Sequence, residues 1–332
     1  MTTHPKITRR ASLKALVAAA VGGIAPKTLV AQGSWPNRPL KMIVPFPSGG
    51  TADVLARLMA QRLADALGQP IVIDNKPGAA GNIGSEAAAK SPNDGYNLFY
   101  GTIGTNGGIN LALYPKLAYD PVKDFSPIAL AHTLPNVLVV NQNVPARSVA
   151  ELITWLKANP GQANYASSGN GGISHLGAEL FKTMTGVQMT HVPYKGGAAA
   201  LTDLIGGQVQ LMFETAPNAL VHYRAGKVRA LGVSTARRSA TAPELPAIGE
   251  TVAGYEVNTW TAMYAPAGTP REVVQRIAAE MARLQKSPDY AERLAKIGSD
   301  APESSPEHLA GFMQSEIAKW GKIVRDTGAK VD

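Results

Sequence analysis

Four glycine-rich polar segments of this chain could hold a small ligand. They read P-F-P-S-G-G-T-A-D at 45–53, S-S-G-N-G-G-I-S at 167–174, Y-K-G-G-A at 194–198 and G-T-I-G-T-N-G-G at 101–108. Each precedes the expected start of a helix, where free N–H groups and the positive end of the helix dipole favour an anion. Because ligands of open α/β sheets bind beyond the carboxyl ends of the strands, we expect the four loops to hold a carboxylate there. Glycine-rich turns also occur for packing alone, which is the alternative interpretation.

Motifs of common enzyme classes are not matched. The segment G-A-A-G-N-I-G at 78–84 is not a dinucleotide fingerprint, and the chain has neither a phosphate loop nor a G-x-S-x-G elbow. The histidines after residue 31 show no zinc-binding spacing. The sequence therefore predicts no metal and no cofactor.

A serine hydrolase remains one alternative. Ser168, His175 and Asp203 are the residue types of a catalytic triad. Nothing in their spacing requires a triad. His175 is also consistent with a helix residue that hydrogen-bonds a neighbouring loop.

Single charged and aromatic residues near the loops have more than one interpretation. Lys195 could pair with a ligand carboxylate or be solvated. Glu214 could contact a ligand amine or hydroxyl, bond across the cleft or face solvent. Asp53 lies in a first helical turn, where a negative charge supports the helix dipole, so we expect a structural role. Trp260 is expected in the core, whereas Phe46 lies in the first loop and is expected to touch a ligand.

The elements that position these loops alternate between strand and helix. Strands are predicted at 40–44, 71–74, 97–100, 136–140, 164–167, 190–192, 209–213, 230–234 and 263–265. Helices are predicted at 51–67, 83–90, 148–158, 174–184 and 198–205, and further helices start near 270, 288 and 306. Capping boxes are expected at 148–151 and 269–272. This order predicts parallel sheets covered by helices, and two sheets rather than one.

Composition narrows the class of protein. The chain has 332 residues, which allows one large domain or two of ordinary size, and it has no cysteine. Disulfides, thiolate metal sites and cysteine nucleophiles are therefore excluded. The hydrophobic fraction of 45% excludes disorder for most of the chain.

Residues 1–31 have the layout of an export signal. Four basic residues precede a ten-residue apolar stretch, and a small residue stands before Gln32. The T-R-R-A-S-L-K run at 8–14 approaches a twin-arginine signal, so Sec and twin-arginine export are both open. Five of the net +8 charges lie in this segment, which leaves +3 and no basic run for nucleic acid. We therefore expect a soluble periplasmic protein.

Seven further segments give the chain a family resemblance. They are W-P at 35–36, I-V-P-F-P at 43–47, N-K-P-G-A-A-G-N-I-G at 75–84, Y-A-S-S-G-N-G at 165–171, H-V-P-Y-K-G at 191–196, D-L-I-G-G-Q-V at 203–209 and A-G-K-V-R-A-L at 225–231. With these segments the chain resembles the Bug family of periplasmic solute receptors, the TctC-type binding proteins of tripartite tricarboxylate transporters. The resemblance covers the chain from about residue 35 to its end.

The resemblance implies an α/β fold of the type II periplasmic-binding-protein class. Two Rossmann-like lobes would surround a ligand cleft and be joined by two crossover segments. Lobe 1 would hold residues 33–135 plus 260–332, and lobe 2 would hold residues 136–259. Lobe closure would bring both sets of loops onto the ligand.

Site residues follow from the loops and from the resemblance together. In the family the first loop holds a ligand carboxylate, and the opposing lobe supplies the other contacts. Ser48 and Gly197 depart from the usual family residues. The predicted ligand-binding residues are Phe46, Ser48, Gly49, Gly50, Thr51, Ala52, Thr102, Thr105, Ser168, Asn170, Gly171, Tyr194, Lys195, Gly196, Gly197, Asp203 and Glu214.

The implied function is a receptor without catalytic activity. It would capture a small organic carboxylate and deliver it to the membrane permease of a tripartite tricarboxylate transporter, as a monomer. The alternatives are an exported serine hydrolase using Ser168 and His175, and a ligand-sensing receptor for a signalling partner. Sparse charge around the loops argues against a tricarboxylate ligand, whereas dicarboxylates, aromatic carboxylates, acidic amino acids and nicotinate-like compounds stay open.

Overall fold

The computed structural model describes residues 1–2, 35–239 and 241–330. It divides into two units, Met1–Asn37 and Arg38–Asp332, and the account below concerns the second. The predicted export signal at 1–31 lies outside the described residues except for its first two. Among the helices that the structure describes, none is both long enough and apolar enough to cross a membrane.

Eight of the nine strands that the structure describes follow one continuous path of hydrogen-bonded neighbours. The order is β2-β1-β3-β9-β4-β7-β5-β6, and β8 pairs with β4 beside this path. The strands are β1 (Leu40–Val44), β2 (Ile71–Asn75), β3 (Asn97–Thr102), β4 (Phe125–Val140), β5 (Asn164–Ser167), β6 (Thr190–Pro193), β7 (Leu211–Thr215), β8 (Arg229–Val233) and β9 (Asn258–Pro266).

Parallel pairing is confined to two groups of strands. β1 pairs in parallel with β2 and β3, and β5 pairs in parallel with β6 and β7. β4 and β9 run antiparallel to each other and to every other strand that they pair with. The prediction of purely parallel sheets is therefore wrong, because the two strands that join the groups do not follow the βαβ rule.

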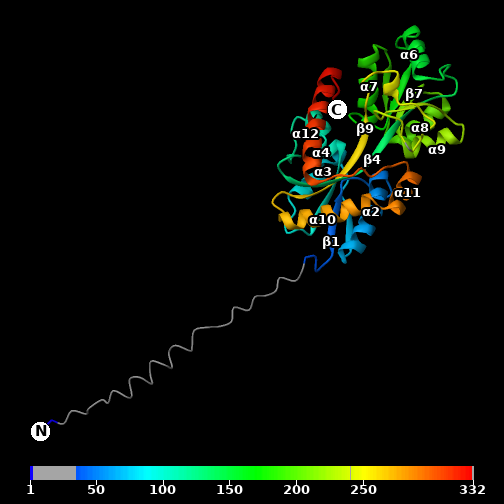
Figure 1. Ribbon diagram of the computed structural model, residues 1–332. Coiled ribbons are helices and arrows are strands. Elements are labelled where there is room, and N and C mark those ends of the chain that lie inside the picture. Colours follow the sequence, from blue (N-terminus) through cyan, green and yellow to red (C-terminus); the bar gives the residue numbers. More distant parts are fainter. Residues whose placement is uncertain (3–34, 240, 331–332) are drawn as a thin grey trace. The chain divides into compact units, whose positions relative to one another are not determined.

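β4 is the longest of the described strands, and together with β9 it joins the two groups. It pairs with β9 along its first part and with β7 and β8 along its last part. Figure 1 shows β4 beside β9. The sequence predicted only its last five residues. The first part of the strand was not predicted because Pro127 and Pro135 lie in it, and proline lacks the N–H that a central strand donates. Register shifts near Pro127 and near His132 accommodate the irregular sequence.

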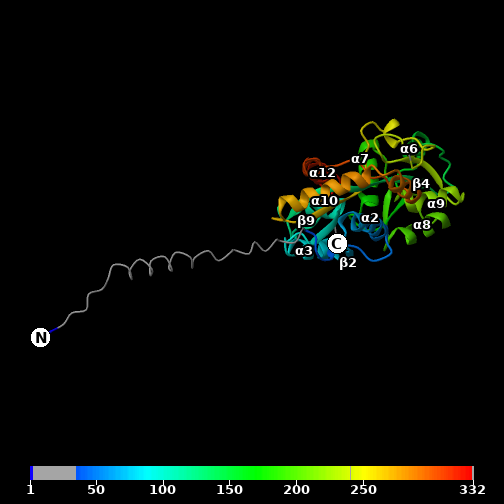
Figure 2. The same ribbon diagram turned by 60° about the horizontal axis from the view of Figure 1, so that its bottom comes forward.

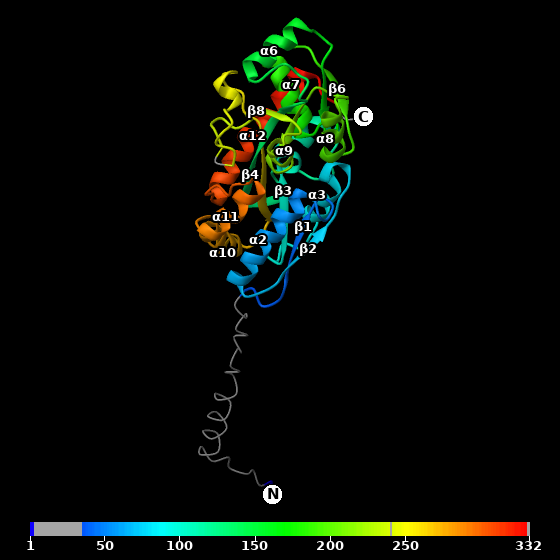
Figure 3. The same ribbon diagram turned by 90° about the vertical axis from the view of Figure 1, so that its right-hand side faces the viewer.

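Helices cover both groups of strands. They are α2 (Thr51–Leu67), α3 (Asn82–Ala89), α4 (Ile103–Asn106), α5 (Ile109–Leu113), α6 (Val149–Ala158), α7 (Ile173–Thr185), α8 (Gly197–Gly206), α9 (Ala216–Arg224), α10 (Arg271–Gln285), α11 (Pro288–Ile297) and α12 (Pro306–Thr327). In Figure 3, α2 and α3 lie with β1–β3, whereas α6, α7, α8 and α9 lie with the other group. α10 packs on α2 and β4 and lies beside α12, which Figure 2 shows.

Most predicted helices form within one or two residues of their expected ends. α4 and α9 were not predicted, and for α5 only a start after the loop at 101–108 was expected, since their sequences carry glycine, or proline and asparagine, at the first turn. Ser148 caps α6 by accepting a hydrogen bond from the Glu151 N–H at 3.1 Å. The predicted cap of α10 is wrong, because the Thr269 hydroxyl donates to the Pro266 carbonyl at 2.8 Å instead.

The core lies on both faces of the end of β4. Leu138 and Val140 belong to one buried cluster, and Val137 and Val139 belong to another. Successive side chains of a strand point to opposite faces, so a continuous apolar run is needed where helices cover both. The end of β4 is therefore packed against buried side chains on both of its faces.

Candidate functional site

The carboxyl ends of the strands surround a cavity of about 590 Å³. Its walls include the loops that follow β1, β3, β5 and β6, together with the end of β7. The four glycine-rich loops singled out from the sequence therefore meet at one place. Two threonines of β9 and Leu134 of β4 complete the wall.

Eleven of the seventeen predicted site residues line this cavity. They are Phe46, Gly50, Thr51, Ala52, Thr102, Ser168, Asn170, Gly171, Gly196, Gly197 and Glu214. The other six do not line it. They are Ser48, Gly49, Thr105, Tyr194, Lys195 and Asp203.

The buried carboxylate of Asp53 holds the glycine-rich loop at 45–53 in place. Asp53 Oδ2 accepts hydrogen bonds from the Gly49 N–H and from Arg57 Nε, both at 2.9 Å. Asn75 Nδ2 donates to Asp53 Oδ1 at 2.9 Å and to the Phe46 carbonyl at 3.0 Å. The expectation of a structural role for Asp53 is confirmed, and this role holds the loop in place before α2.

The same contacts set the charge of Asp53. Burial alone would raise the pKa of this carboxyl, but the hydrogen bonds from Arg57, Gly49 and Asn75 outweigh burial. The pKa of Asp53 is lowered from 3.8 to about 2. Asp53 is therefore ionised at any physiological pH. Its charge is stabilised by contacts within the protein and does not face the cavity.

The first turn of α2 faces the cavity with its N–H groups uncapped by a side chain. The N-cap is Gly50, which makes no side-chain cap, and Thr51 and Ala52 line the cavity. Free N–H groups at a helix start attract an anion. This wall can therefore hold a carboxylate without a basic side chain.

The opposite wall carries three more helix starts of the same kind. α7, α8 and α9 begin after Gly172, Gly196 and Thr215, and none of these residues makes a side-chain cap. All three residues line the cavity. Two walls with uncapped helix starts thus face one space.

Apolar side chains cover much of the space between these starts. They are Phe46, Leu55, Ile103, Ile109, Leu113, Leu134 and Ile173. Among the residues that the structure describes, no lysine, arginine or histidine lines this cavity. The walls therefore suit a ligand with an apolar body and acidic ends.

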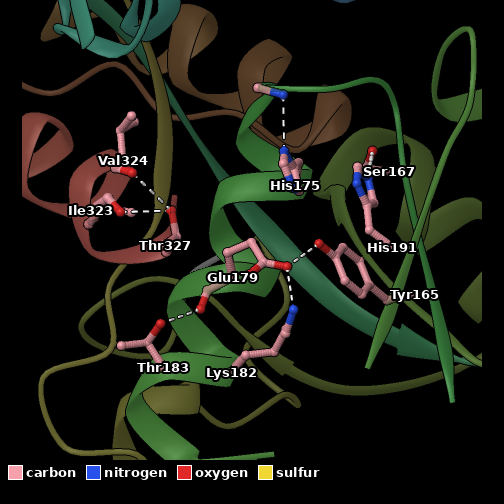
Figure 4. A network of polar contacts seen from close by, with 11 residues as sticks. Tyr165, Ser167, His175, Glu179, Lys182, Thr183, His191, Ile323, Val324 and Thr327 are labelled. Atoms are coloured by element: carbon pink, nitrogen blue, oxygen red, sulfur yellow. Dashed lines mark hydrogen bonds and ion pairs between the residues drawn. The ribbon is translucent and has the colours of Figure 1, made fainter. Parts of the chain in front are cut away.

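A stack of three rings lies behind the loop after β5. His175 and His191 are parallel with ring centroids 4.0 Å apart, and Tyr165 stacks on His191 at 4.8 Å. His175 Nδ1 accepts a hydrogen bond from the Gly171 N–H at 3.0 Å, and His191 Nε2 bonds Ser167 Oγ at 2.6 Å. Figure 4 shows both contacts. The predicted bond between His175 and a neighbouring loop is confirmed.

Burial keeps both imidazoles neutral. It lowers the pKa of His175, and burial together with the neighbouring His175 lowers the pKa of His191 to about 4. Below the rings, Tyr165 donates to Glu179 at 2.5 Å, and Lys182 donates to the same carboxylate oxygen at 2.7 Å (Figure 4). The stack supports the Gly171 segment of the cavity wall.

The structure does not assemble the hydrolase triad. Ser168 Oγ bonds Ser174 Oγ at 3.0 Å, and His175 Nδ1 is taken by the Gly171 N–H. Asp203 Oδ2 accepts from the Tyr194 hydroxyl at 2.8 Å. Each member of the suggested triad is thus engaged with another group.

Four predicted polar site residues, Thr105, Tyr194, Lys195 and Asp203, lie away from the cavity. Tyr194 and Asp203 bond to each other, and Lys195 is exposed to solvent. Thr105 is buried in a reciprocal cap with Thr102, whose N–H donates to Thr105 Oγ1 at 2.9 Å. Of this last pair only Thr102 reaches the cavity wall.

Glu214 is buried at the end of β7. Its Oε1 accepts from the Thr215 N–H at 2.9 Å, from Thr215 Oγ1 at 2.8 Å and from Asn218 Nδ2 at 3.3 Å. Burial raises the pKa of Glu214 despite these hydrogen bonds. The residue lines the cavity.

Several polar wall residues escaped the sequence analysis. Asn110, Asn218, Thr259 and Thr261 line the cavity, and none belongs to a glycine-rich loop. The N-T-W-T run at 258–261 carried a signal, because threonines two residues apart share one face of a strand. Trp260 between them points to the core, as predicted, and donates to Glu316 at 2.9 Å.

No metal cluster is formed by the described residues. Within 35–239 and 241–330, no group of three or more His, Cys, Asp or Glu side chains is placed to hold an ion.

Comparison with protein families identifies one match. The model of the tripartite tricarboxylate transporter family receptor, TctC, matches residues 55–329. Protein BugT of Bordetella pertussis is 36% identical over 328 residues, which cover 98% of this chain and 99% of BugT.

Solved structures agree with this match. Rpa4515 of R. palustris, solved with adipate, superposes with a TM-score of 0.81 at 41% identity and covers 90% of this chain and 100% of its own. The periplasmic binding protein BugD gives 0.76 at 32% identity, covering 89% of this chain and 99% of its own. MatC of Rhodopseudomonas palustris, with bound malate, gives 0.75 at 34%, covering 87% and 100%. The predicted type of α/β fold is thereby confirmed.

Proposed function

Because the chain belongs to the tripartite tricarboxylate transporter receptor family, we propose that it is a periplasmic receptor for a small organic carboxylate. It binds the acid in the cavity at the carboxyl ends of the strands and has no catalytic role. The single observation that carries this proposal is the convergence of four uncapped helix starts on one largely apolar cavity.

The binding event is electrostatic at the ends of the ligand and hydrophobic between them. Backbone N–H groups at the start of α2 hold one carboxylate, since a helix N-terminus carries about half a positive charge. Apolar wall side chains cover the body of the ligand. Relatives support this ligand class, because Rpa4515 was solved with adipate and MatC with malate.

Closure of two lobes completes the site. The lobes are residues 33–135 with 260–332 and residues 136–259, and β4 and β9 cross between them. Only the closed state contacts the ligand from both walls, so binding shifts the population towards closure. The closed receptor delivers its ligand, as a monomer, to the membrane permease of a tripartite tricarboxylate transporter.

Residence in the periplasm follows from the export signal predicted at 1–31. The relative BugD, a periplasmic binding protein, supports this placement. Export uses the Sec or the twin-arginine route, and cleavage after Ala31 leaves a mature chain of residues 32–332.

A thermal-shift screen tests the ligand class. The mature protein is melted with adipate, malate, citrate, benzoate, glutamate and nicotinate, and with adipamide as the uncharged counterpart. A ligand that binds only the folded state raises the melting temperature by mass action. We expect at least one acid to raise it and adipamide to leave it unchanged. If folded, ligand-free protein responds to none of the acids, the proposal is wrong.

Two variants of α2 test whether the ligand binds in the cavity. Ala52→Glu adds a negative charge to a cavity-lining position at the helix start, and we expect it to abolish the acid-induced shift. Val54→Glu adds the same charge on an exposed position two residues on, which does not line the cavity. Its shift should match that of the unmodified protein. An equal response of both variants would place the ligand elsewhere.

A further inference from the structure

One carboxyl group lies between two of the helix starts on the cavity wall. Glu214 is 5% exposed, and its Oε1 accepts all of the hydrogen bonds that Thr215 and Asn218 donate. Its Oε2 is buried and has no hydrogen-bond partner among the described residues. A buried ionised carboxylate is costly when one oxygen has no donor.

The unpartnered oxygen lies against the start of α8. A Cβ placed on Gly197 would lie 2.4 Å from Glu214 Oε2, so the first residue of the helix covers this oxygen closely. Oε1 lies at the start of α9, where it bonds Thr215. One carboxyl group therefore touches the positive ends of two helices that line the cavity.

No cationic side chain neutralises Glu214. Within the described residues, none of the ionisable groups on the elements packed against β7 hydrogen-bonds or ion-pairs with it. These groups are His132 on β4, Tyr165 on β5, His175, Glu179 and Lys182 on α7, Asp203 on α8, and His222, Tyr223 and Arg224 on α9. Lys195, before α8, is exposed. Across the cavity, Asp53 is bonded to Arg57, and Tyr114 lines the wall.

The charge of Glu214 changes the electrostatic potential at the starts of α8 and α9. When ionised, it occupies the positive ends of α8 and α9 and repels an incoming carboxylate at close range. When neutral, it leaves the N–H groups and dipoles of both starts to the ligand. Burial raises the pKa of this carboxyl and thereby favours its neutral form.

We propose that Glu214 is a proton-dependent selectivity residue, whose neutral form lets the starts of α8 and α9 accept the second carboxylate of a dicarboxylate. This inference rests on the proposed function, in which the start of α2 holds the first carboxylate. The apolar walls between the two ends match the methylene chain of such an acid. Binding of the dianion at a pH where free Glu214 is ionised takes up one proton from the buffer.

Calorimetric titrations with three acids of equal chain length test this inference. Adipate has two carboxylates, hexanoate lacks the second, and 6-aminohexanoate replaces it with an ammonium group. Each is titrated into the mature protein between about pH 6.5 and 8.5, in buffers of different ionisation enthalpy, so that proton uptake is measured directly.

Glu214→Gln is the informative variant. The amide keeps an oxygen for Thr215 and Asn218 and a similar shape beside Gly197, but it cannot ionise. Glu244→Gln changes an exposed carboxyl in the same part of the chain and is the matched control.

We expect the affinity of the unmodified protein for adipate to fall as the pH rises, by up to tenfold per pH unit, with uptake of up to one proton. Glu214→Gln should bind adipate with one affinity over the whole range and take up no proton. Glu244→Gln should behave like the unmodified protein. Hexanoate should bind with no proton uptake to all three proteins.

Two results would overturn the inference and leave the receptor proposal in place. The first is adipate binding without proton uptake and with the same pH profile in Glu214→Gln. The second is preferred binding of 6-aminohexanoate that Glu214→Gln abolishes, which would make Glu214 an ionised acceptor for an amine. If folded, ligand-free protein binds no carboxylate in this series or in the thermal-shift panel, the receptor proposal fails and the inference fails with it.

Discussion

Asp53 shows how one side chain prepares a binding loop without touching the ligand. It does not line the cavity, yet it holds Gly49 directly and Phe46 through Asn75. Gly49 has a φ of +80°, a conformation that residues with a side chain rarely adopt. The loop is thus held at the start of α2 by contacts within the protein, and such preorganisation lowers the entropy lost on binding.

Asp53→Asn should loosen this loop. The variant loses the charge that Arg57 and the Gly49 N–H stabilise, so we expect a loss of about 1–2 kcal/mol in unfolding free energy and weaker carboxylate binding. Urea unfolding at pH 7 measures the first effect. Asp65→Asn, an exposed change on the same helix, should stay within about 0.5 kcal/mol of the unmodified protein.

The difference between Asp53→Asn and the unmodified protein should depend on pH. The folded pKa of Asp53 is about 2 and its ordinary value is 3.8. The stabilisation is therefore complete above about pH 4 and is lost as the pH falls through about 2. Thermal melts over this range should converge. A constant difference would mean that the charge of Asp53 is not what stabilises the loop.

Gly197 should tolerate no side chain, in contrast to the other end of its helix. An alanine Cβ there would lie 2.4 Å from Glu214 Oε2, so Gly197→Ala should destabilise the protein by about 1–3 kcal/mol and weaken ligand binding. Gly206 belongs to the same helix and has open space around it. Gly206→Ala should be neutral or stabilising by up to about 1 kcal/mol. Equal effects in denaturant unfolding would refute the close packing at Glu214.

At the scale of elements, α12 packs on β4 and is hydrogen-bonded to β9. Glu316 Oε2 accepts from Trp260 Nε1 at 2.9 Å and from Trp320 Nε1 at 3.0 Å, and all three side chains are buried. α12 also packs on α5, α7 and β4, which places it against both groups of strands.

Glu316→Ala should therefore be strongly destabilising. It leaves two buried indole N–H groups without an acceptor, which predicts a loss of about 2–4 kcal/mol in urea unfolding. Glu303→Ala removes an exposed carboxylate that pairs with Lys286 at 3.4 Å, and should change stability by less than about 1 kcal/mol. Similar losses in the two variants would contradict the role of Glu316.

The ring stack behind the β5 loop predicts acid sensitivity. The pKa of His191 is about 4 in the folded state against an ordinary 6.5, and the pKa of His175 is lowered too. Protons therefore favour the unfolded chain, and stability should be complete above about pH 6.5 and fall towards pH 4. Each histidine contributes at most about 1.4 kcal/mol per pH unit. Melting curves of His191→Asn should show a shallower fall, and an unchanged slope would exclude His191 as its source.

How far the sequence could predict the fold differs from element to element. α2, with its apolar stripe and clear first turn, was predicted almost to the residue, and the start of α12 was predicted at its proline. β4 was predicted only at its apolar end, because its pairing with β9 is set by tertiary contacts that override its prolines. Glycine-rich loops indicated the cavity, whereas Thr259 and Thr261 reached it through a long-range strand pairing.

At the scale of the whole molecule, the proposed receptor works by moving one group of elements against another. β4 and β9 are the two strands that cross between the proposed lobes, and their pairing runs from Phe125 to Pro135 on β4. Two neighbouring strands that pass between lobes permit a hinge while keeping each lobe rigid.

Small-angle scattering should detect this motion. A saturating acid that raises the melting temperature is expected to reduce the radius of gyration of the mature protein, because the closed state contacts the ligand from both walls. Ala52→Glu should show no change under the same conditions. An identical radius with and without bound acid would mean that binding takes place without closure.

Calorimetric titration of the mature protein with adipate and with adipamide is the most direct test of the central claim, that uncapped helix starts hold a carboxylate in the cavity. The two compounds share their length and apolar body and differ in charge. We predict saturable 1:1 binding of adipate and none of adipamide. Binding of both with equal affinity would show that the helix starts do not select a charged end, and would contradict the account.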